Sequence, residues 1–225
     1  MKVTTDACLF GAWVAEEVKS QNEKVKNVLD IGTGTGLLSL MFAQKNHSAI
    51  IDAIEIDIDA YEQAKENVAS SLFSQRINTI NEDVKTFPFS KKYDVIISNP
   101  PFYEKEIKAA DEKKNIAHHH SGLLLEELTN IIKTNLTPAG AFYLLLPFKR
   151  NGEFKKILLK QDLHIQKLVF VRQSTNHNYF RLMIQGQLKN ERQPETIIDE
   201  LSIWNDQKEY TKEFRELLKD YYLHL

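Results

Sequence analysis

The sequence predicts an α/β protein with a doubly wound, mostly parallel seven-stranded sheet and an antiparallel terminal strand. Segments typical of buried strands alternate with segments of helical period along most of the chain, and such alternation is typical of parallel sheets with right-handed crossovers. A glycine-rich stretch, 32–36, joins the first strand directly to a helix. Two late strands, 164–171 and 180–188, follow one another with no helix between them, which predicts an antiparallel hairpin.

Each expected element rests on its own pattern. Helical periodicity is found in the segments 7–19, 37–45, 58–71, 123–136 and 154–160. Runs rich in β-branched and aromatic residues predict strands at 25–31, 49–55, 76–81, 93–98, 141–146, 164–171 and 180–188. Asp57 or Asp59 is placed to cap the third helix, and Thr137 with Pro138 should end the fourth. The alternation covers most of the 225 residues, so we expect one domain over 1–225.

Composition limits the class of protein. With 225 residues and 42% hydrophobic content, the chain is long enough to bury a substantial core. The single cysteine, Cys8, excludes an intramolecular disulfide and fits a reducing compartment. The sequence shows neither an apolar run of membrane-spanning length nor a charged and then apolar leader. We therefore expect a cytoplasmic protein with no membrane partner.

The net charge of −2 hides an uneven distribution of charge along the chain. Residues 145–192 hold ten Lys and Arg against three acids, a balance of +7, whereas 193–225 hold eight acids against four bases, a balance of −4. A basic segment of this kind favours a nucleic-acid partner, although a solvated surface with no partner gives the same pattern. The candidate contacts to a nucleic-acid backbone are Lys149, Arg150, Arg172 and Arg181.

The end of the first strand predicts a binding loop. Glycines at alternate positions, Gly32, Gly34 and Gly36, allow a ligand to approach the backbone closely, and the helix that follows offers free N–H groups. Their spacing fits the dinucleotide fingerprint poorly, because the position three after Gly34 is Leu37. Asp30, just before the glycines, would repel a pyrophosphate and suits a cation such as an α-amino group.

The second candidate site follows the strand 93–98. Two prolines, Pro100 and Pro101, come directly after Asn99. They cannot donate to a sheet ladder, so Asn99 should be held just beyond the strand's carboxyl end, where ligands bind in open α/β sheets. Asn99 Oδ1 and the Pro100 carbonyl can each accept one hydrogen of an amine on a flat ring, while Phe102 stacks on that ring. A simple strand-ending turn is the alternative.

The residues 30–36 resemble motif I of the class I S-adenosylmethionine-dependent methyltransferases, a Rossmann-like family. The resemblance implies S-adenosylmethionine as cofactor. Glu55, 19 residues after Gly36, then takes the ribose hydroxyls. Asp83 accepts from the adenine amine, and the backbone N–H of Val84 reaches a ring nitrogen. The expected cofactor-binding residues are Asp30, Gly32, Gly34, Gly36, Glu55, Asp83, Val84 and Asn99.

The residues 99–102 resemble motif IV of the branch of this class that methylates exocyclic or amide nitrogens. The segment 1–13 resembles the opening of the bacterial tRNA1(Val) (adenine(37)-N6)-methyltransferases, and 210–223 is similar to their closing helix. The resemblance implies methyl transfer to the N6 of adenine 37 in the anticodon loop. Asn99, Pro100 and Phe102 are the expected catalytic residues, and the expected substrate-binding residues are Pro101, Phe102, Tyr103, Lys149, Arg150, Arg172 and Arg181.

Further expectations complete this interpretation. Residues 1–20 should form a helix that covers the cofactor site, 103–120 a loop over the substrate base, and 194–225 a C-terminal extension. His118, His119 and His120 are adjacent and cannot all face one ion, so we expect no metal, and the chain is expected to be a monomer. Two alternatives stay open: an N5-methyltransferase of a protein glutamine, which would not need the basic segment, and a non-catalytic RNA-binding module.

Overall fold

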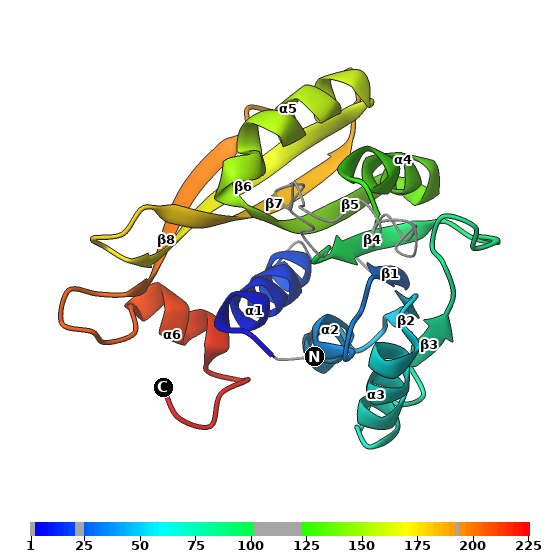
Figure 1. The fold of residues 1–225 in the computed structure, drawn as a ribbon, viewed down its shortest axis with the longest axis horizontal. Helices are drawn as coiled ribbons and strands as arrows, with labels where there is room; N and C mark the ends of the chain where they lie inside the picture. The colour runs from blue at the N-terminus through cyan, green and yellow to red at the C-terminus, as the bar shows by residue number, and fades with distance from the viewer. Residues whose placement is uncertain (1–2, 21–24, 101–122, 192–193) are drawn as a thin grey trace, which may run out of the picture.

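A computed structural model describes residues 3–20, 25–100, 123–191 and 194–225. The described strands are β1 (Asn27–Ile31), β2 (Ile50–Glu55), β3 (Ile77–Asn81), β4 (Tyr93–Ser98), β5 (Leu136–Pro147), β6 (Leu163–Ser174), β7 (Tyr179–Leu188) and β8 (Ile197–Trp204). The helices of the described residues are α1 (Thr5–Ser20), α2 (Leu37–Lys45), α3 (Ile58–Ala69), α4 (Leu125–Asn135), α5 (Asn151–Lys160) and α6 (Lys212–Leu218), and a 3-10 turn, η1, covers Phe148–Arg150. They form the fold in Figure 1.

The described strands form one sheet in the order β3-β2-β1-β4-β5-β7-β6-β8. The first five strands along the chain pair in parallel, whereas β7 is antiparallel to both of its neighbours, β5 and β6. The strand order reverses at β1, which lies between β2 and β4. In open α/β sheets, a ligand binds at the carboxyl ends of the strands beside such a switch point.

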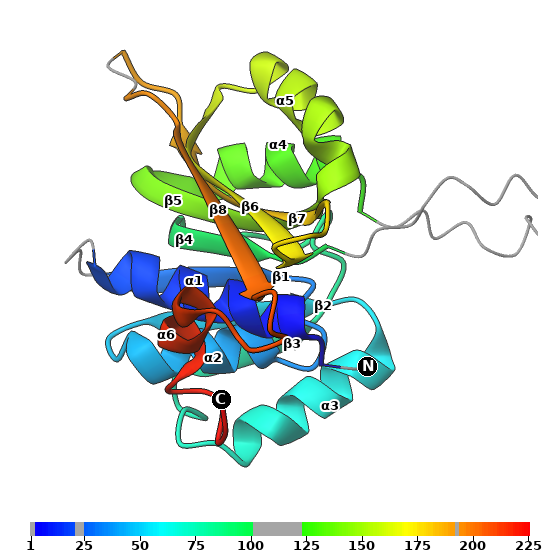
Figure 2. The ribbon, with the colours of Figure 1, turned by 90° about the vertical axis from the view of Figure 1, so that its left-hand side faces the viewer.

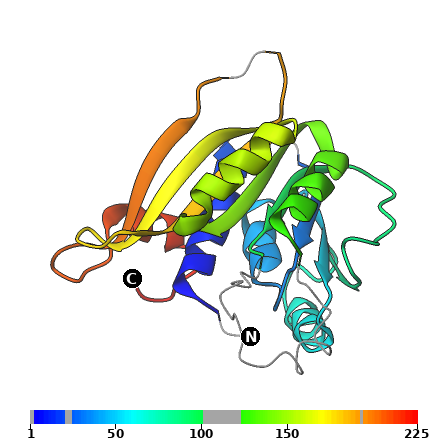
Figure 3. The ribbon, with the colours of Figure 1, turned by 45° about the horizontal axis from the view of Figure 1, so that its top comes forward.

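Helices cover both faces of the sheet, as Figure 2 shows. One core lies between the sheet and α1, α2 and α6, and it includes Phe10, Phe42 and Phe214. The other lies under α4 and α5, which run side by side in Figure 3, and it includes Phe142 and Phe154. Side chains of β5 alternate between the two cores, as a sheet buried on both faces requires. The doubly wound fold is thus confirmed.

The structure corrects the strand count and two boundaries. The described sheet has eight strands rather than seven, because β8 pairs in parallel with β6. The strand β8 contains Asp199 and Glu200 and is exposed over its first four residues, so it lacks the apolar alternation that marks a strand. The expected antiparallel strand, β7, is the last of the predicted strands along the chain, and it lies between β5 and β6 in the sheet. The helix α4 ends at Asn135, and β5 already begins at Leu136, before Pro138.

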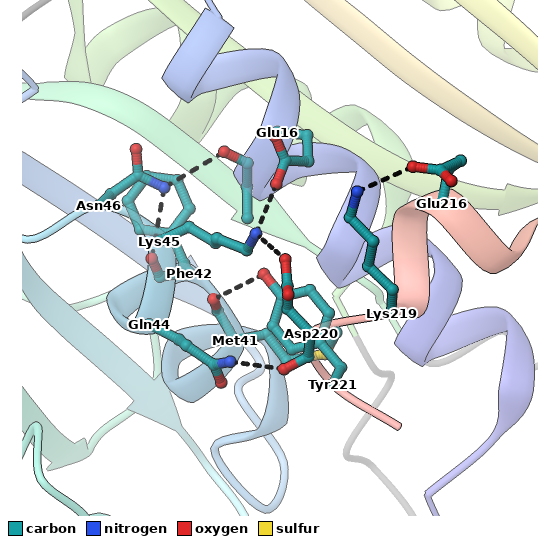
Figure 4. A network of polar contacts seen from close by, with 11 residues as sticks. Glu16, Met41, Phe42, Gln44, Lys45, Asn46, Glu216, Lys219, Asp220 and Tyr221 are labelled. Atoms are coloured by element: carbon teal, nitrogen blue, oxygen red, sulfur yellow. Dashed lines mark hydrogen bonds and ion pairs between the residues drawn. The ribbon is translucent and has the colours of Figure 1, made fainter. Parts of the chain in front are cut away.

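The C-terminal segment is tied to α1 and α2 by polar contacts, drawn in Figure 4. Lys45, at the end of α2, forms an ion pair with Glu16 of α1 at 2.8 Å and a second with Asp220. The Tyr221 hydroxyl donates to the carbonyl of Met41 at 3.1 Å. These contacts join three segments that are distant in the sequence, so they fix α1 against α2, the helix that begins at the glycine-rich loop.

Candidate active site

The polar residues predicted for the site lie at the carboxyl ends of the parallel strands, called the carboxyl edge of the sheet below. Ile31 of β1 pairs with both Ile54 of β2 and Ser98 of β4. The Ser98 hydroxyl also donates to the Ile31 carbonyl at 2.8 Å. Because these strands are parallel, the loop after Ile31, the end of β2 at Glu55 and the first residue after β4, Asn99, are side by side. The structure therefore brings the glycine-rich loop, Glu55 and Asn99 together.

The glycine-rich loop has a backbone that only glycine adopts readily. Gly32, Gly34 and Gly36 have φ values of 68°, 59° and 82°, in the left-handed region that disfavours other residues. The amides of Gly32 and Thr33 donate to the Ile54 carbonyl at 2.9 and 3.1 Å, which anchors the loop on β2. A Cβ added to Gly32 would meet no atom of the described residues within 4 Å. The loop thus borders an open space.

Asp30 lies under this loop and is fully buried. Its Oδ2 accepts hydrogen bonds from the hydroxyls of Thr33 at 2.6 Å and Ser39 at 2.7 Å. Its Oδ1 is buried and has no hydrogen-bond partner among the described residues. Burial raises the pKa of Asp30 to about 6, with a further rise from the charge of Glu55, although the two hydroxyls act in the opposite direction. A buried anion with one unpartnered oxygen is an environment suited to a cationic ligand group.

Glu55 supports the glycine-rich loop with one carboxylate oxygen and the start of α3 with the other. Its Oε2 accepts from the amide of Gly34 at 2.8 Å, and its Oε1 accepts from the amide of Asp57 at 3.0 Å. The side chain is buried. Each carboxylate oxygen can accept more than one hydrogen bond, so Glu55 retains capacity for ligand hydroxyls while it supports the loop.

Asp83 and Val84 follow β3 in a turn. The amides of Thr86 and Phe87 both donate to the Asp83 carbonyl at 3.0 Å, and Asp83 Oδ1 accepts from the amide of Lys85 at 2.9 Å. The Asp83 side chain is partly exposed, whereas Val84 packs into the core beside β3. The turn places Asp83 two residues beyond the end of β3, whose last residue pairs with Glu55, at the same edge as the glycine-rich loop.

The described part of the second motif ends at Pro100. Asn99 is partly buried and Pro100 is buried, so both stand at the carboxyl end of β4 as expected from the sequence. Pro101, Phe102 and Tyr103, together with the expected loop 103–120 and the three histidines, lie outside the described residues. Their predicted roles stay predictions.

The four basic candidates lie around the ends of β5, β6 and β7, and three of them contact carboxylates. Arg150 forms two hydrogen bonds with Glu153, at 2.9 and 2.7 Å. Arg172 lies 3.2 Å from Glu200, and Arg181 lies 2.6 Å from Asp6 of α1. Lys149, in η1, is exposed. All four basic candidates thus lie near the carboxyl ends of the parallel strands, and the contacts of Arg150, Arg172 and Arg181 with carboxylates also stabilise the fold.

Three residues that support the site were missed from the sequence. Thr33 and Ser39 hold Asp30, and Asp6 holds Arg181. A signal for Ser39 was present, because it is the one polar residue in the apolar run 37–43 and a buried serine needs a partner. The partnership of Asp6 and Arg181 spans 175 residues and has no local signal.

Two other kinds of feature are absent from the residues that the structure describes. Across 3–20, 25–100, 123–191 and 194–225, no group of three or more His, Cys, Asp or Glu side chains is arranged to hold a metal ion. Within those same ranges, no helix has the length and apolar character needed to cross a membrane.

Comparison with solved structures agrees with this geometry. The fold is similar to that of a predicted O-methyltransferase from Agrobacterium tumefaciens, with a TM-score of 0.68, 14% identity and 94% of each chain covered. It is also similar to a glycopeptide N-methyltransferase complexed with S-adenosylmethionine, with a TM-score of 0.57, 12% identity, and 79% of this chain and 94% of the other covered. The fold and the loop at the switch point define a methyltransferase of the class that uses S-adenosylmethionine.

Sequence comparisons narrow the class to a family. The model of the methyltransferase small domain matches residues 13–141. A relative from Dyadobacter fermentans is 39% identical, with 99% of this chain and 91% of that protein covered, and one from Christiangramia forsetii is 37% identical, with 100% and 92% covered. Both are named tRNA1(Val) (adenine(37)-N6)-methyltransferase. The chain belongs to this family.

Proposed function

We propose that this enzyme transfers a methyl group from S-adenosylmethionine to the exocyclic N6 of adenine 37 in the anticodon loop of tRNA1(Val). The observation that carries the proposal is the register of β1 and β4, since the Ser98–Ile31 hydrogen bond sets Asn99 beside the glycine-rich loop. A methyl donor held by that loop and an amine held by Asn99 would then be neighbours. The names of the relatives supply the tRNA and the position of the adenine.

The residues at this edge fit the cofactor. The unpartnered Asp30 Oδ1 and the open space beside Gly32 provide negative charge and room for a cationic ligand. We assign Asp30 with Gly32, Gly34 and Gly36 to its amino-acid end. Glu55 is assigned to the ribose hydroxyls, and Asp83 with the N–H of Val84 to the adenine. When bound, S-adenosylmethionine supplies a methyl group on a positively charged sulfur, whose departure needs no general acid.

Asn99 and Pro100 provide the acceptors that the amine requires. The N6 lone pair of adenine is delocalised into the ring and is weakly nucleophilic. Acceptors at Asn99 Oδ1 and the Pro100 carbonyl, one for each N–H, favour a tetrahedral amine whose lone pair faces the methyl group. Positioning and preorganised dipoles therefore supply the catalysis, and no strong base is needed. Phe102 is proposed to stack on the adenine with Tyr103, and Pro101 to contact the substrate.

The remaining assignments concern the tRNA and the cell. We propose that the basic candidates Lys149, Arg150, Arg172 and Arg181 contact the tRNA backbone, and that 1–20 covers the cofactor site. The segment 103–120 is proposed to cover the base and 194–225 to extend one methyltransferase domain over 1–225. A cytoplasmic, monomeric protein that needs neither metal nor membrane fits these assignments. Methylation of a protein glutamine and a non-catalytic RNA-binding role are not favoured, because the relatives are named tRNA methyltransferases.

Parallel transfer assays test the proposal. Labelled S-adenosylmethionine is incubated with unmodified tRNA, duplex DNA and a release-factor-like protein, and the products are digested to nucleosides or peptides. We expect label only in N6-methyladenosine from tRNA. Label in the protein would overturn the tRNA assignment, and binding of the cofactor without any transfer would favour the non-catalytic alternative.

A further inference from the structure

Three aromatic rings pack together near the carboxyl ends of β5 and β6, where β7 begins. Phe148 begins η1, Phe170 lies near the end of β6, and Tyr179 begins β7. Their ring centroids are 5.7 Å apart for Phe148 and Phe170, 5.4 Å for Phe148 and Tyr179, and 5.2 Å for Phe170 and Tyr179. All three residues are partly exposed. This aromatic cluster, Phe148, Phe170 and Tyr179, therefore retains surface that can meet another molecule.

Arg172 extends the aromatic cluster with a guanidinium group. Its Cζ lies 5.6 Å from the centroid of the Tyr179 ring. The strand β8 holds it there, because Arg172 Nε donates to the Ser202 hydroxyl at 2.8 Å and its Nη2 lies 3.2 Å from the Glu200 carboxylate. Guanidinium planes and aromatic faces are the two side-chain surfaces on which nucleobases stack. The aromatic cluster and Arg172 thus provide both kinds of stacking group side by side.

The aromatic cluster lies at the same end of the sheet as Asn99. Ser98 pairs with Leu144, so Asn99 is level with the next residue of β5, and Phe148 follows three residues later. With neighbouring strands about 4.8 Å apart and a rise of about 3.3 Å per residue, the backbone of Phe148 lies roughly 11 Å from that of Asn99. Arg181 of β7 pairs with Pro147, so Tyr179 lies beyond the same edge. A short piece of RNA can reach both places at once.

We propose that the aromatic cluster and Arg172 form a stacking surface for an unpaired base next to the methylated adenine, an inference that rests on the proposed function. An adenine drawn into the site from a loop leaves its neighbours unstacked, and a nearby aromatic surface compensates for that loss. The basic segment 145–192 contains every residue of this surface and carries a local balance of +7, which complements an RNA backbone. An unpaired base of the substrate RNA is therefore the expected occupant.

Kinetics of conservative variants test the stacking surface. Tyr179→Leu and Phe148→Leu keep an apolar side chain but remove the flat ring. With an anticodon stem–loop as substrate, we expect the KM for RNA to rise about tenfold, because a stacked base contributes on the order of 1–3 kcal/mol. The affinity for S-adenosylmethionine, measured by calorimetry, should be unchanged. Tyr179→Phe, which restores the ring, should restore the KM.

The structure offers a matched control at the amino end of β3, away from the proposed stacking surface. Phe73 is also partly exposed, and the guanidinium of Arg76 lies 5.3 Å from its ring, just before β3 begins. Phe73→Leu should leave the KM for RNA as it is in the wild type. An unchanged KM in Tyr179→Leu and Phe148→Leu, with an active wild type, would overturn the stacking surface alone. If the wild type methylates no RNA, the proposed function fails first.

A binding measurement gives an independent readout. Stem–loops that carry 2-aminopurine on either side of the target adenine, one at a time, report stacking by loss of fluorescence. We expect the wild type to change the fluorescence at one of the two positions and Tyr179→Leu to abolish that change. Identical signals from the wild type and Tyr179→Leu at both positions would contradict the inference.

Discussion

Arg181 of β7 donates through Nε to Asp6 of α1 at 2.6 Å, so the first turn of α1 is attached to the carboxyl edge of the sheet. Burial opposes the ionisation of Asp6, but hydrogen bonds from Thr4 and Arg181 and the charge of Arg181 outweigh it and hold the pKa of Asp6 below its usual value. This ion pair lies beside the proposed stacking surface. Arg181 therefore has a structural partner as well as a proposed one in RNA.

A double-mutant cycle measures the first of these partnerships. Asp6→Asn and Arg181→Met should each lower the free energy of unfolding, and the two losses should overlap by about 1–2 kcal/mol, because each removes the same partly buried ion pair. Urea denaturation of the four proteins provides the values. Strictly additive losses would show that the contact contributes nothing to stability.

Asp30 predicts a dependence of stability on pH. Its pKa is about 6 in the folded protein against 3.8 in the unfolded chain, so between these values the folded state holds the extra proton. The free energy of unfolding should therefore fall as pH rises through that window, to a total of roughly 3 kcal/mol. Asp30→Asn, without cofactor, should lack this slope. Its free energy of unfolding should therefore rise relative to that of the wild type as the pH increases. Urea denaturation of both proteins from pH 4 to 7.5 tests this prediction. Parallel plots of the free energy of unfolding against pH would refute it.

The same variant should bind S-adenosylmethionine poorly. Asp30→Asn removes the buried negative charge while it keeps the shape of the side chain, so the affinity should fall by more than about tenfold. Calorimetry at pH 7.5 gives the affinity. An unchanged dissociation constant would remove Asp30 from the cofactor site.

Asn99 variants separate chemistry from folding. Asn99→Ala removes an acceptor for the amine, so kcat should fall by about a hundredfold or more. Asn99→Asp retains an acceptor oxygen and should keep more activity than Asn99→Ala. Single-turnover transfer to tRNA ranks the three proteins, and thermal unfolding checks that they are folded. Equal activity of Asn99→Ala and the wild type would exclude the assigned role.

The two ion pairs of Lys45 should contribute to the stability of the fold, because they attach the C-terminal segment to α2 and α2 to α1. Lys45→Met leaves Glu16 and Asp220 without their shared cation (Figure 4) and should lower the free energy of unfolding by more than the loss of one isolated exposed ion pair does. Lys219→Met, which breaks the exposed pair with Glu216, is the matched control and should lower the free energy of unfolding by less than Lys45→Met does. Losses of equal size in the two variants would show that the network in Figure 4 adds no stability.

The sequence predicted what local patterns determine. The glycines that need a left-handed backbone, the acidic residue at the end of β2 and the strand that stops at Asn99 all have signals within a few residues, and each lies where the sequence placed it. Asp57 caps α3 as one of the two candidates, since its side chain accepts from Ala60 N at 2.9 Å.

What the sequence missed depends on distant partners. The strand β8 is exposed over its first half, where it carries Asp199 and Glu200, and it forms because β6 offers an edge to pair with. The aromatic cluster assembles from Phe148, Phe170 and Tyr179, which are up to 31 positions apart and meet only through the register of β5, β6 and β7. The basic candidates were inferred from charge alone, which does not show that Arg172 and Arg181 have carboxylate partners.

Mapping the methylated nucleotide is the decisive test of methyl transfer to adenine 37. Unmodified tRNA1(Val) and a transcript with guanine in place of adenine 37 are incubated with the enzyme and S-adenosylmethionine, then cleaved into fragments for mass spectrometry. We expect one added methyl group, on N6 of adenine 37, and none on the transcript with guanine. Methylation of the second transcript, or of any other position in the first, would contradict it.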